Sequence, residues 1–243
     1  MAIQRSLTDL LYPRRCPLCD GLLEKKEPFV CRGCAGKLHF ITGPFCLRCG
    51  KPLDNEEEEY CYDCRRRKHS FLRCRAPFLY RGTVKESLMR FKYGGRAEYA
   101  LFYGGVMAEY GKNCGLFQKI DMIIPVPVHR KRRIERGYNQ AELLAEEMSR
   151  LLDIPMEPGI LKRRKKTRAL KQVSKEARSR SLAEAFSVSE GKGCRLGGKR
   201  ILLVDDIYTT GSTADAVSKK LLQAGAESVT VITLAISPGF SGS

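Results

Sequence analysis

The sequence lacks any long hydrophobic run. A membrane-spanning helix needs roughly 20 consecutive apolar residues, whereas the longest candidates, Met122–Val128 and Ile201–Val204, have only the length of a strand. The start of the chain also lacks the apolar segment of a secretory signal. We therefore expect no membrane insertion and no export, and we predict a cytoplasmic location.

Acidic residues are scarce relative to basic ones. Lysine and arginine number 44 against 27 aspartates and glutamates, so the net charge is +17. The basic residues form three clusters, Arg65–Lys68, Arg130–Arg133 and Lys162–Lys166. Such clustering predicts a polyanionic partner, which includes nucleic acids, phosphates and diphosphates. The alternative is a basic surface that only keeps the protein soluble.

Cysteine, in contrast, is abundant and regularly spaced. Eight of the 11 cysteines form four C-x-x-C pairs, and successive pairs are separated by 11 residues. Two such pairs complete a tetrahedral four-thiolate shell, so four pairs predict two structural Zn²⁺ sites without an open coordination position. We assign one ion to the first four cysteines and one to the last four: Cys16, Cys19, Cys31 and Cys34, then Cys46, Cys49, Cys61 and Cys64.

Disulfides and iron–sulfur clusters are less favoured than zinc at these cysteine pairs. Disulfides are uncommon in cytosolic proteins, and the ribbon-like spacing is more typical of zinc than of an iron–sulfur cluster. An interleaved pairing of the four pairs is an open alternative. This segment has too few large apolar residues for a core of its own, so metal binding would supply its folding free energy.

Beyond about residue 71, strand and helix patterns alternate. Buried strands are predicted at 122–126, 201–204 and 228–236, and helices at 83–91, 96–112, 139–152 and 212–224. Leu101 and Leu151 are among the expected buried positions, and Asn139 with Glu142 has the form of a capping box. The order predicts an α/β fold with a parallel sheet flanked by helices, over residues 71–243, after a zinc-ribbon domain over 1–70.

The segment ILLVDDIYTTGST, residues 201–213, predicts a phosphate site. An apolar strand leads into Asp205 and Asp206, and a loop around Gly211 then opens a helix. Backbone N–H groups at a helix start bind anions, and a carboxylate at the end of a strand can bind sugar hydroxyls. Further hydrogen bonds could come from the hydroxyls of Thr209, Thr210, Ser212 and Thr213.

This segment is neither a G-x-G-x-x-G turn nor a P-loop with its lysine, which argues against NAD and against P-loop NTPases. The alternative without a ligand is a strand, a turn and a capped helix. Two adjacent acids followed by T-T-G-S-T are hard to explain in that way. We therefore expect a ribose that carries a 5′-phosphate.

The same segment resembles the phosphoribosyl-pyrophosphate (PRPP) motif of type I phosphoribosyltransferases. In one branch, the ComF family of competence-associated proteins, the resemblance extends through almost the whole chain. It includes the cysteine pairs, residues 124–129, residues 136–145, Gln172, the arginines around Arg178, and Ala185–Phe186. The chain departs from the pattern at Ser181, where asparagine is expected.

The resemblance implies roles for individual residues. Asp205 and Asp206 would be the catalytic pair and hold the ribose 2′- and 3′-hydroxyls, while Thr209, Thr210, Gly211, Ser212 and Thr213 would bind the 5′-phosphate. Pyrophosphate would bind a loop made of Pro127, Val128, His129 and Arg130. A flexible loop would close over the site and contribute Lys171, Gln172 and Arg178.

The function implied is phosphoribosyl transfer, or recognition of PRPP with Mg²⁺, in natural competence and DNA uptake. Single-stranded DNA and other competence or recombination proteins are the expected partners. The alternative function is a single-stranded nucleic-acid-binding factor whose PRPP site is not catalytic. Ala2 follows Met1, so no amino-terminal cysteine nucleophile is available for a glutamine-dependent amidotransferase.

Overall fold

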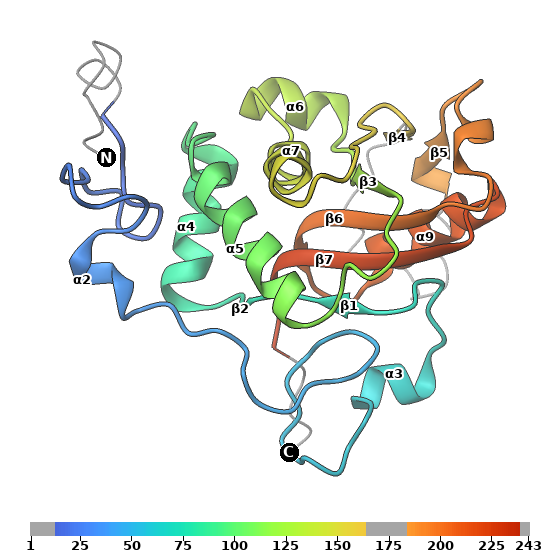
Figure 1. Cartoon of the computed structure of the whole chain (residues 1–243), viewed down its shortest axis with the longest axis horizontal. Coiled ribbons are helices and arrows are strands. Elements are labelled where there is room, and N and C mark those ends of the chain that lie inside the picture. The colour runs from blue at the N-terminus through green and yellow to red at the C-terminus, as the bar shows by residue number, and fades with distance from the viewer. Residues whose placement is uncertain (1–12, 164–183, 239–243) are drawn as a thin grey trace, which may run out of the picture.

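The computed structural model describes residues 13–163 and 184–238, and its centre is a parallel β-sheet (Figure 1). Strands β6 (Arg200–Tyr208) and β7 (Ser228–Ile236) pair in the middle, and β3 (Met122–Pro125) pairs with the other side of β6. The short strands β1 (Cys74–Arg75) and β2 (Phe78–Leu79) follow one another along the outer side of β7. Every pairing between these five strands is parallel.

The central strands form because their apolar runs are covered on both faces. In β6, Ile201, Leu202, Leu203 and Val204 are fully buried. One face of the sheet packs against α4 (Gly82–Tyr93), α5 (Tyr99–Asn113) and α7 (Gln140–Leu152). The other face packs against α9 (Ser212–Gln223). The α/β fold predicted from the alternating pattern is confirmed.

The prediction that Leu101 and Leu151 are buried is wrong. Leu101 is 56% exposed and Leu151 is 38% exposed. In α5 the face toward the sheet is set by the large side chains of Tyr99, Tyr103 and Met107, which are fully buried and turn Leu101 outward. Periodicity had located the helix correctly but not its rotation about its own axis.

Shorter elements lie around the sheet (Figure 1). They are α2 (Arg32–Ala35), α3 (Tyr62–Arg66), α6 (Arg130–Arg136) and a 3₁₀ turn, η1 (Gly193–Leu196). Strands β4 (Leu161–Arg163) and β5 (Phe186–Val188) form a separate antiparallel pair. None of the helices in the described ranges is long and apolar enough to cross a membrane.

The cysteine-rich segment lies against the sheet domain in two places. Cys46, Cys49 and Leu53 share a core with Phe71 and with the face of the sheet that α9 covers. Cys16, Cys31 and Cys34 form a smaller cluster of their own with Leu18 and Leu23. The second half of the segment is therefore part of the main hydrophobic core, whereas the first half has a separate small core next to the sheet domain.

Candidate functional site

The acidic pair lies inside strand β6 rather than after it. The strand continues to Tyr208, with Asp205 opposite Thr233 and Tyr208 opposite Ile236 of β7. Backbone pairing thus extends four residues beyond the apolar run 201–204 that predicted the strand. Successive side chains of a strand point to opposite faces. Asp205 lines a pocket, and Asp206 instead contacts Lys92 of α4.

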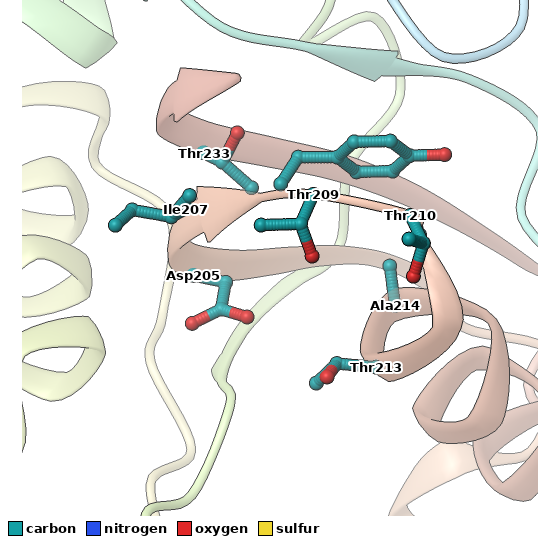
Figure 2. A pocket seen from close by; sticks show the side chains of 9 residues that line it. Asp205, Ile207, Thr209, Thr210, Thr213, Ala214 and Thr233 are labelled. Atoms are coloured by element: carbon teal, nitrogen blue, oxygen red, sulfur yellow. The ribbon is translucent and has the colours of Figure 1, made fainter. Parts of the chain in front are cut away.

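A small pocket, with a cavity volume of about 40 Å³, lies between the end of β6 and the start of α9. Figure 2 shows the Asp205 carboxylate and the hydroxyls of Thr209 and Thr210 around a common space. The lining residues are Asp205, Ile207, Tyr208, Thr209, Thr210, Gly211, Thr213, Ala214 and Thr233. A carboxylate and several hydroxyls in one small cavity suit a polar, phosphorylated ligand more than an apolar one.

Gly211 allows the chain to turn from the strand into α9. Its φ of 73° is in the left-handed region that favours glycine. A Cβ atom at this position would collide with the phenol group of Tyr208. Just beyond the glycine, the hydroxyl of Ser212 hydrogen-bonds that of Thr210 at 2.9 Å. The close approach of the loop to Tyr208 therefore requires glycine.

Asp205 has an unusual electrostatic environment. Burial raises the pKa of its carboxyl to about 7, and the neighbouring Asp206 carboxylate adds to that rise. The backbone N–H of Asp206 donates a 2.8 Å hydrogen bond to Asp205, and the charges of Lys92 and Arg163 also act to lower the pKa. A raised carboxyl pKa of this kind is common at ligand-binding and active sites.

The loop predicted to bind pyrophosphate reaches the same edge of the sheet. Because β3 and β6 are parallel neighbours, the residues after both strands lie at one end of the sheet. Pro127, Val128 and His129 are half-buried and Arg130 is exposed. His129 caps α6, since its Nδ1 accepts a 3.2 Å hydrogen bond from the Lys131 N–H.

Asn139 stabilises this loop and does not form the capping box expected from the sequence. Its side chain makes no cap hydrogen bond to α7. Instead, Nδ2 donates a 3.1 Å hydrogen bond to the Val126 carbonyl, at the exit of β3. The capping prediction is wrong because Asn139 is buried and bonds the neighbouring strand.

The predicted flexible-loop residues Lys171, Gln172 and Arg178 lie outside the described residues. The two strands that flank this segment are described. Arg163 ends β4, and its guanidinium lies 5.1 Å from the ring centre of Phe186 in β5. The antiparallel pairing of Arg163 with Phe186 places both ends of the intervening segment side by side.

Lys92 is a residue that the sequence patterns did not reveal. Its Nζ lies 2.9 Å from Oδ2 of Asp206, and both side chains are about 85% buried, with exposures of 14% and 15%. The sequence offered one signal, a lysine at the end of a helix directly before Tyr93, Gly94 and Gly95. Nothing in that pattern connects position 92 with a strand more than a hundred residues later.

The eight paired cysteines gather into two tetrads. The thiols of Cys16, Cys19, Cys31 and Cys34 form one group, and those of Cys46, Cys49, Cys61 and Cys64 form the other, each within 4.8 Å. This is the consecutive pairing that we predicted, not the interleaved one. None of the 11 cysteines, all of which lie in the described ranges, forms a disulfide.

The tetrads fit zinc by distance as well as by ligand type. The Cys19 and Cys31 sulfurs are 3.7 Å apart, and those of Cys49 and Cys61 are 3.6 Å apart. A tetrahedron with Zn–S bonds of about 2.3 Å has S···S edges of about 3.8 Å. Because every position is a thiolate, both sites are structural in type.

The first tetrad is attached to α4 and α5 by hydrogen bonds. The carbonyls of Pro17 and Leu18 accept from Ser87 and Arg90, both on α4. Asp20 accepts from Arg96 at 2.8 Å and from the Tyr99 hydroxyl at 2.6 Å. Pro17 and Leu18, between Cys16 and Cys19, are thus bound to the helix whose last turn carries Lys92.

Comparison with known proteins agrees with this two-part organisation. The family described as double zinc ribbon domain matches residues 7–65, and the family described as phosphoribosyl transferase domain matches residues 138–239. Among solved structures, the glutamine PRPP amidotransferase of B. subtilis aligns with 59% of this chain and 30% of its own, at 22% identity and a TM-score of 0.41. That likeness is weak, and sequence relatives are more informative.

Three relatives match nearly end to end. Competence protein F of Haemophilus influenzae is 33% identical, over 91% of this chain and 96% of its own. Competence protein ComFC of Bacillus subtilis is 34% identical, over 90% and 93%. DNA utilization protein YhgH of Escherichia coli is 26% identical, over 91% and 96%. Identity of this level along both full lengths, with the two domain matches in order, shows that the chain belongs to the ComF family of competence proteins.

Proposed function

We propose that this protein binds PRPP in the Asp205 pocket and is a phosphoribosyltransferase that acts in competence and DNA uptake. One observation supports the proposal above the others. A strand-borne carboxylate and the hydroxyl-rich start of a helix line the same small pocket. Relatives named as competence and DNA utilization proteins support the biological setting.

The 5′-phosphate is proposed to bind at the start of α9. This helix has 12 residues, and its free N–H groups and dipole favour an anion beyond Gly211. The hydroxyls of Thr209, Thr210 and Thr213 line the same space and can donate to phosphate oxygens. Ser212 contributes through its hydrogen bond with Thr210.

The ribose and pyrophosphate are proposed to extend along the edge of the sheet. Asp205 and Asp206 accept hydrogen bonds from the vicinal hydroxyls of the ribose, and the loop Pro127–Arg130 binds the pyrophosphate. Lys171, Gln172 and Arg178 remain proposed contributors from the segment between β4 and β5. The proposed place of action is the cytoplasm, a reducing compartment in which cysteines remain available to hold zinc.

The reaction proposed is a displacement at C1′ of the ribose. A lone pair of the acceptor forms the new bond to C1′ while the bond from C1′ to pyrophosphate breaks, and the electron pair leaves with the pyrophosphate. The protein holds the ribose and the phosphate at fixed positions and neutralises the leaving charge with basic groups. Mg²⁺, when bound, supplies further charge neutralisation, and the hard carboxylate oxygens of Asp205 and Asp206 suit it.

Calorimetric titration of the zinc-loaded protein with PRPP in the presence of Mg²⁺ tests the proposal. We expect saturable binding that Asp205→Asn weakens at least tenfold. Asp153→Asn is the matched control, because Asp153 is exposed at the C-cap of α7 and has a left-handed φ that asparagine accepts. A wild type that does not bind PRPP would refute the proposal.

A second candidate function is binding of single-stranded DNA. The observation that favours it is α6, on which Arg130, Lys131 and Arg132 are exposed beside the proposed pyrophosphate loop. Basic side chains of this kind neutralise backbone phosphates, which makes affinity salt-dependent. Such binding would be compatible with a PRPP site and with other competence or recombination proteins as partners.

Fluorescence anisotropy with a labelled single strand tests this second function. Lys131→Gln combined with Arg132→Gln should lower the affinity and reduce the slope of log affinity against log salt by about 0.7 for each lost phosphate contact. Arg65→Gln combined with Arg66→Gln, in a different basic cluster on α3, is the control. An unchanged salt slope in the α6 variant would exclude α6 as the DNA surface.

A further inference from the structure

Lys92 occupies a position in the site that neither the sequence nor the family comparison had indicated. It is the penultimate residue of α4, and its Nζ lies 2.9 Å from Oδ2 of Asp206. Lys92 and Asp206 are nearly buried, with 14% and 15% of their side-chain surfaces exposed. An ion pair with so little solvent contact is much less screened than a surface pair.

The end of α4 is held firmly in this position. The Phe91 carbonyl accepts a 2.6 Å hydrogen bond from the Tyr138 hydroxyl and a 3.3 Å hydrogen bond from Nε2 of Gln140. On the other side of Lys92, the Tyr93 hydroxyl accepts from Arg136 at 2.9 Å, and the guanidinium stacks over the ring at 4.7 Å. The two residues that flank Lys92 are therefore fixed, and the ammonium group is directed to Asp206.

Two adjacent carboxylates attract a cation. The Asp206 carboxylate lies next to the carboxyl of Asp205, which lines the pocket, and hard oxygen ligands of this kind suit Mg²⁺. The charge of Asp206, however, is balanced by the ammonium group of Lys92 at hydrogen-bonding distance. A divalent ion that approached Asp206 would have to displace the ammonium group and meet its repulsion.

We propose that Lys92 is the resident cation of the acidic pair: it excludes divalent metal ions from the site before PRPP binds, so that the metal enters only with its diphosphate ligand. This inference rests on the proposed function for the identity of that ligand. Ribose hydroxyls can compete with Lys92 for Asp206, and the lysine stem has enough rotatable bonds to release its ammonium group toward the pyrophosphate. Lys92 is thus a positioning residue that determines when the metal binds.

Electron paramagnetic resonance of Mn²⁺, added to zinc-loaded protein without PRPP, tests the exclusion directly. Manganese replaces Mg²⁺ at oxygen ligands and competes poorly for the cysteine tetrads. Wild type should bind no more Mn²⁺ than Asp206→Asn does. Lys92→Gln removes the charge but retains a hydrogen-bond donor. This variant should bind one Mn²⁺ ion at least tenfold more tightly than wild type does. Lys92→Arg should resemble wild type.

The double variant Lys92→Gln with Asp206→Asn should lose the gained site, which assigns that site to the acidic pair. The proposal is overturned if Lys92→Gln gains no site, or if wild type already binds Mn²⁺ in a manner that Asp206→Asn abolishes. That second comparison decides the matter even if Lys92→Gln does not fold.

A last titration separates this inference from the proposed function. PRPP added to wild type should increase retention of Mn²⁺ by the protein. If PRPP has no effect while Lys92→Gln still gains the Mn²⁺ site, the role of Lys92 is supported and PRPP is not the ligand. If PRPP binds and Lys92→Gln gains no Mn²⁺ site, PRPP binding is supported and the proposed role of Lys92 is wrong.

Discussion

Oδ1 of Asp215 accepts a 2.6 Å hydrogen bond from the backbone N–H of Ser70. Asp215 is in the first turn of α9, which opens the proposed phosphate site, and Ser70 follows the second cysteine tetrad. Arg67 and His69 lie 3.5 Å and 3.6 Å from the same carboxylate. The segment that leaves the zinc ribbon is thus fastened to the helix that forms one wall of the pocket.

Replacement of Asp215 by asparagine should loosen this connection. Burial opposes ionisation of Asp215, but the nearby His69 ring, the hydrogen bond from Ser70 and the charge of Arg67 outweigh it and hold the pKa below its usual range. The variant replaces the negatively charged carboxylate, which accepts from the Ser70 N–H, by a neutral amide. We expect the free energy of unfolding to fall by about 1–3 kcal/mol in urea titrations at neutral pH. Asp153→Asn should change it by less than about 0.5 kcal/mol, and equal effects of the two variants would contradict the account.

A methyl group at position 211 should damage the phosphate loop. Gly211→Ala places a Cβ against the Tyr208 phenol and forces alanine into a left-handed backbone conformation. The strain should cost about 1–3 kcal/mol of stability and lower PRPP affinity, measured by thermal unfolding and calorimetry. Gly43→Ala is the control, since a Cβ there meets nothing within 4 Å. Equal loss of PRPP affinity in Gly43→Ala would show that the loop around Gly211 has no special part in binding.

Asp205 should make the native state less stable as pH rises. Its folded pKa is raised to about 7 from an ordinary value of 3.8, so between these values the native state holds a proton that the unfolded state has lost. Stability contributed by that proton is therefore present below about pH 4 and lost toward pH 7. Because Asp205 is only partly shielded by the pocket, we expect a loss on the order of 1–2 kcal/mol.

Urea titrations of wild type and Asp205→Asn between pH 4.5 and pH 8 measure this effect. Only the difference between the two proteins is informative, because loss of zinc at low pH is common to both. The free energy of unfolding of Asp205→Asn should increase relative to that of wild type as pH rises. A difference that does not change with pH would show that Asp205 titrates normally.

Loss of the second zinc site should weaken ligand binding in the pocket. Cys46 and Cys49 share a hydrophobic core with Tyr208, which lines the pocket. Cys46→Ser should reduce the zinc content from two ions to one by elemental analysis, and lower both Tm and PRPP affinity. Cys16→Ser should also lose one ion but affect PRPP binding less, because its tetrad lies in a separate cluster. Cys194→Ser, at an exposed cysteine, should retain both ions.

The sequence contained most of the fold because its signals were local. The cysteine spacing predicted both tetrads with their correct pairing, since a C-x-x-C pair brings two thiolates together within one turn. The apolar run 201–204 predicted the central strand, but the strand continues to Tyr208. That extension comes from pairing with β7, a contact that no local pattern reports.

The candidate site was predictable in its loop but not in its surroundings. The residues from Asp205 to Thr213 are contiguous, so their proximity follows from the sequence. Lys92 reaches Asp206 only because α4 packs on the sheet, and Asn139 bonds Val126 only because α7 starts beside the exit of β3. Such contacts depend on tertiary packing, which also explains why a capping pattern at Asn139 was misleading.

A crystal structure of the zinc-loaded protein with PRPP and Mg²⁺ tests the central claim most directly. We expect density for the 5′-phosphate at the start of α9, within hydrogen-bonding distance of residues 210–213, and ribose hydroxyls on Asp205 and Asp206. Lys92 should then have left Asp206. An empty pocket at saturating PRPP, or a phosphate bound elsewhere on the chain, would contradict the account.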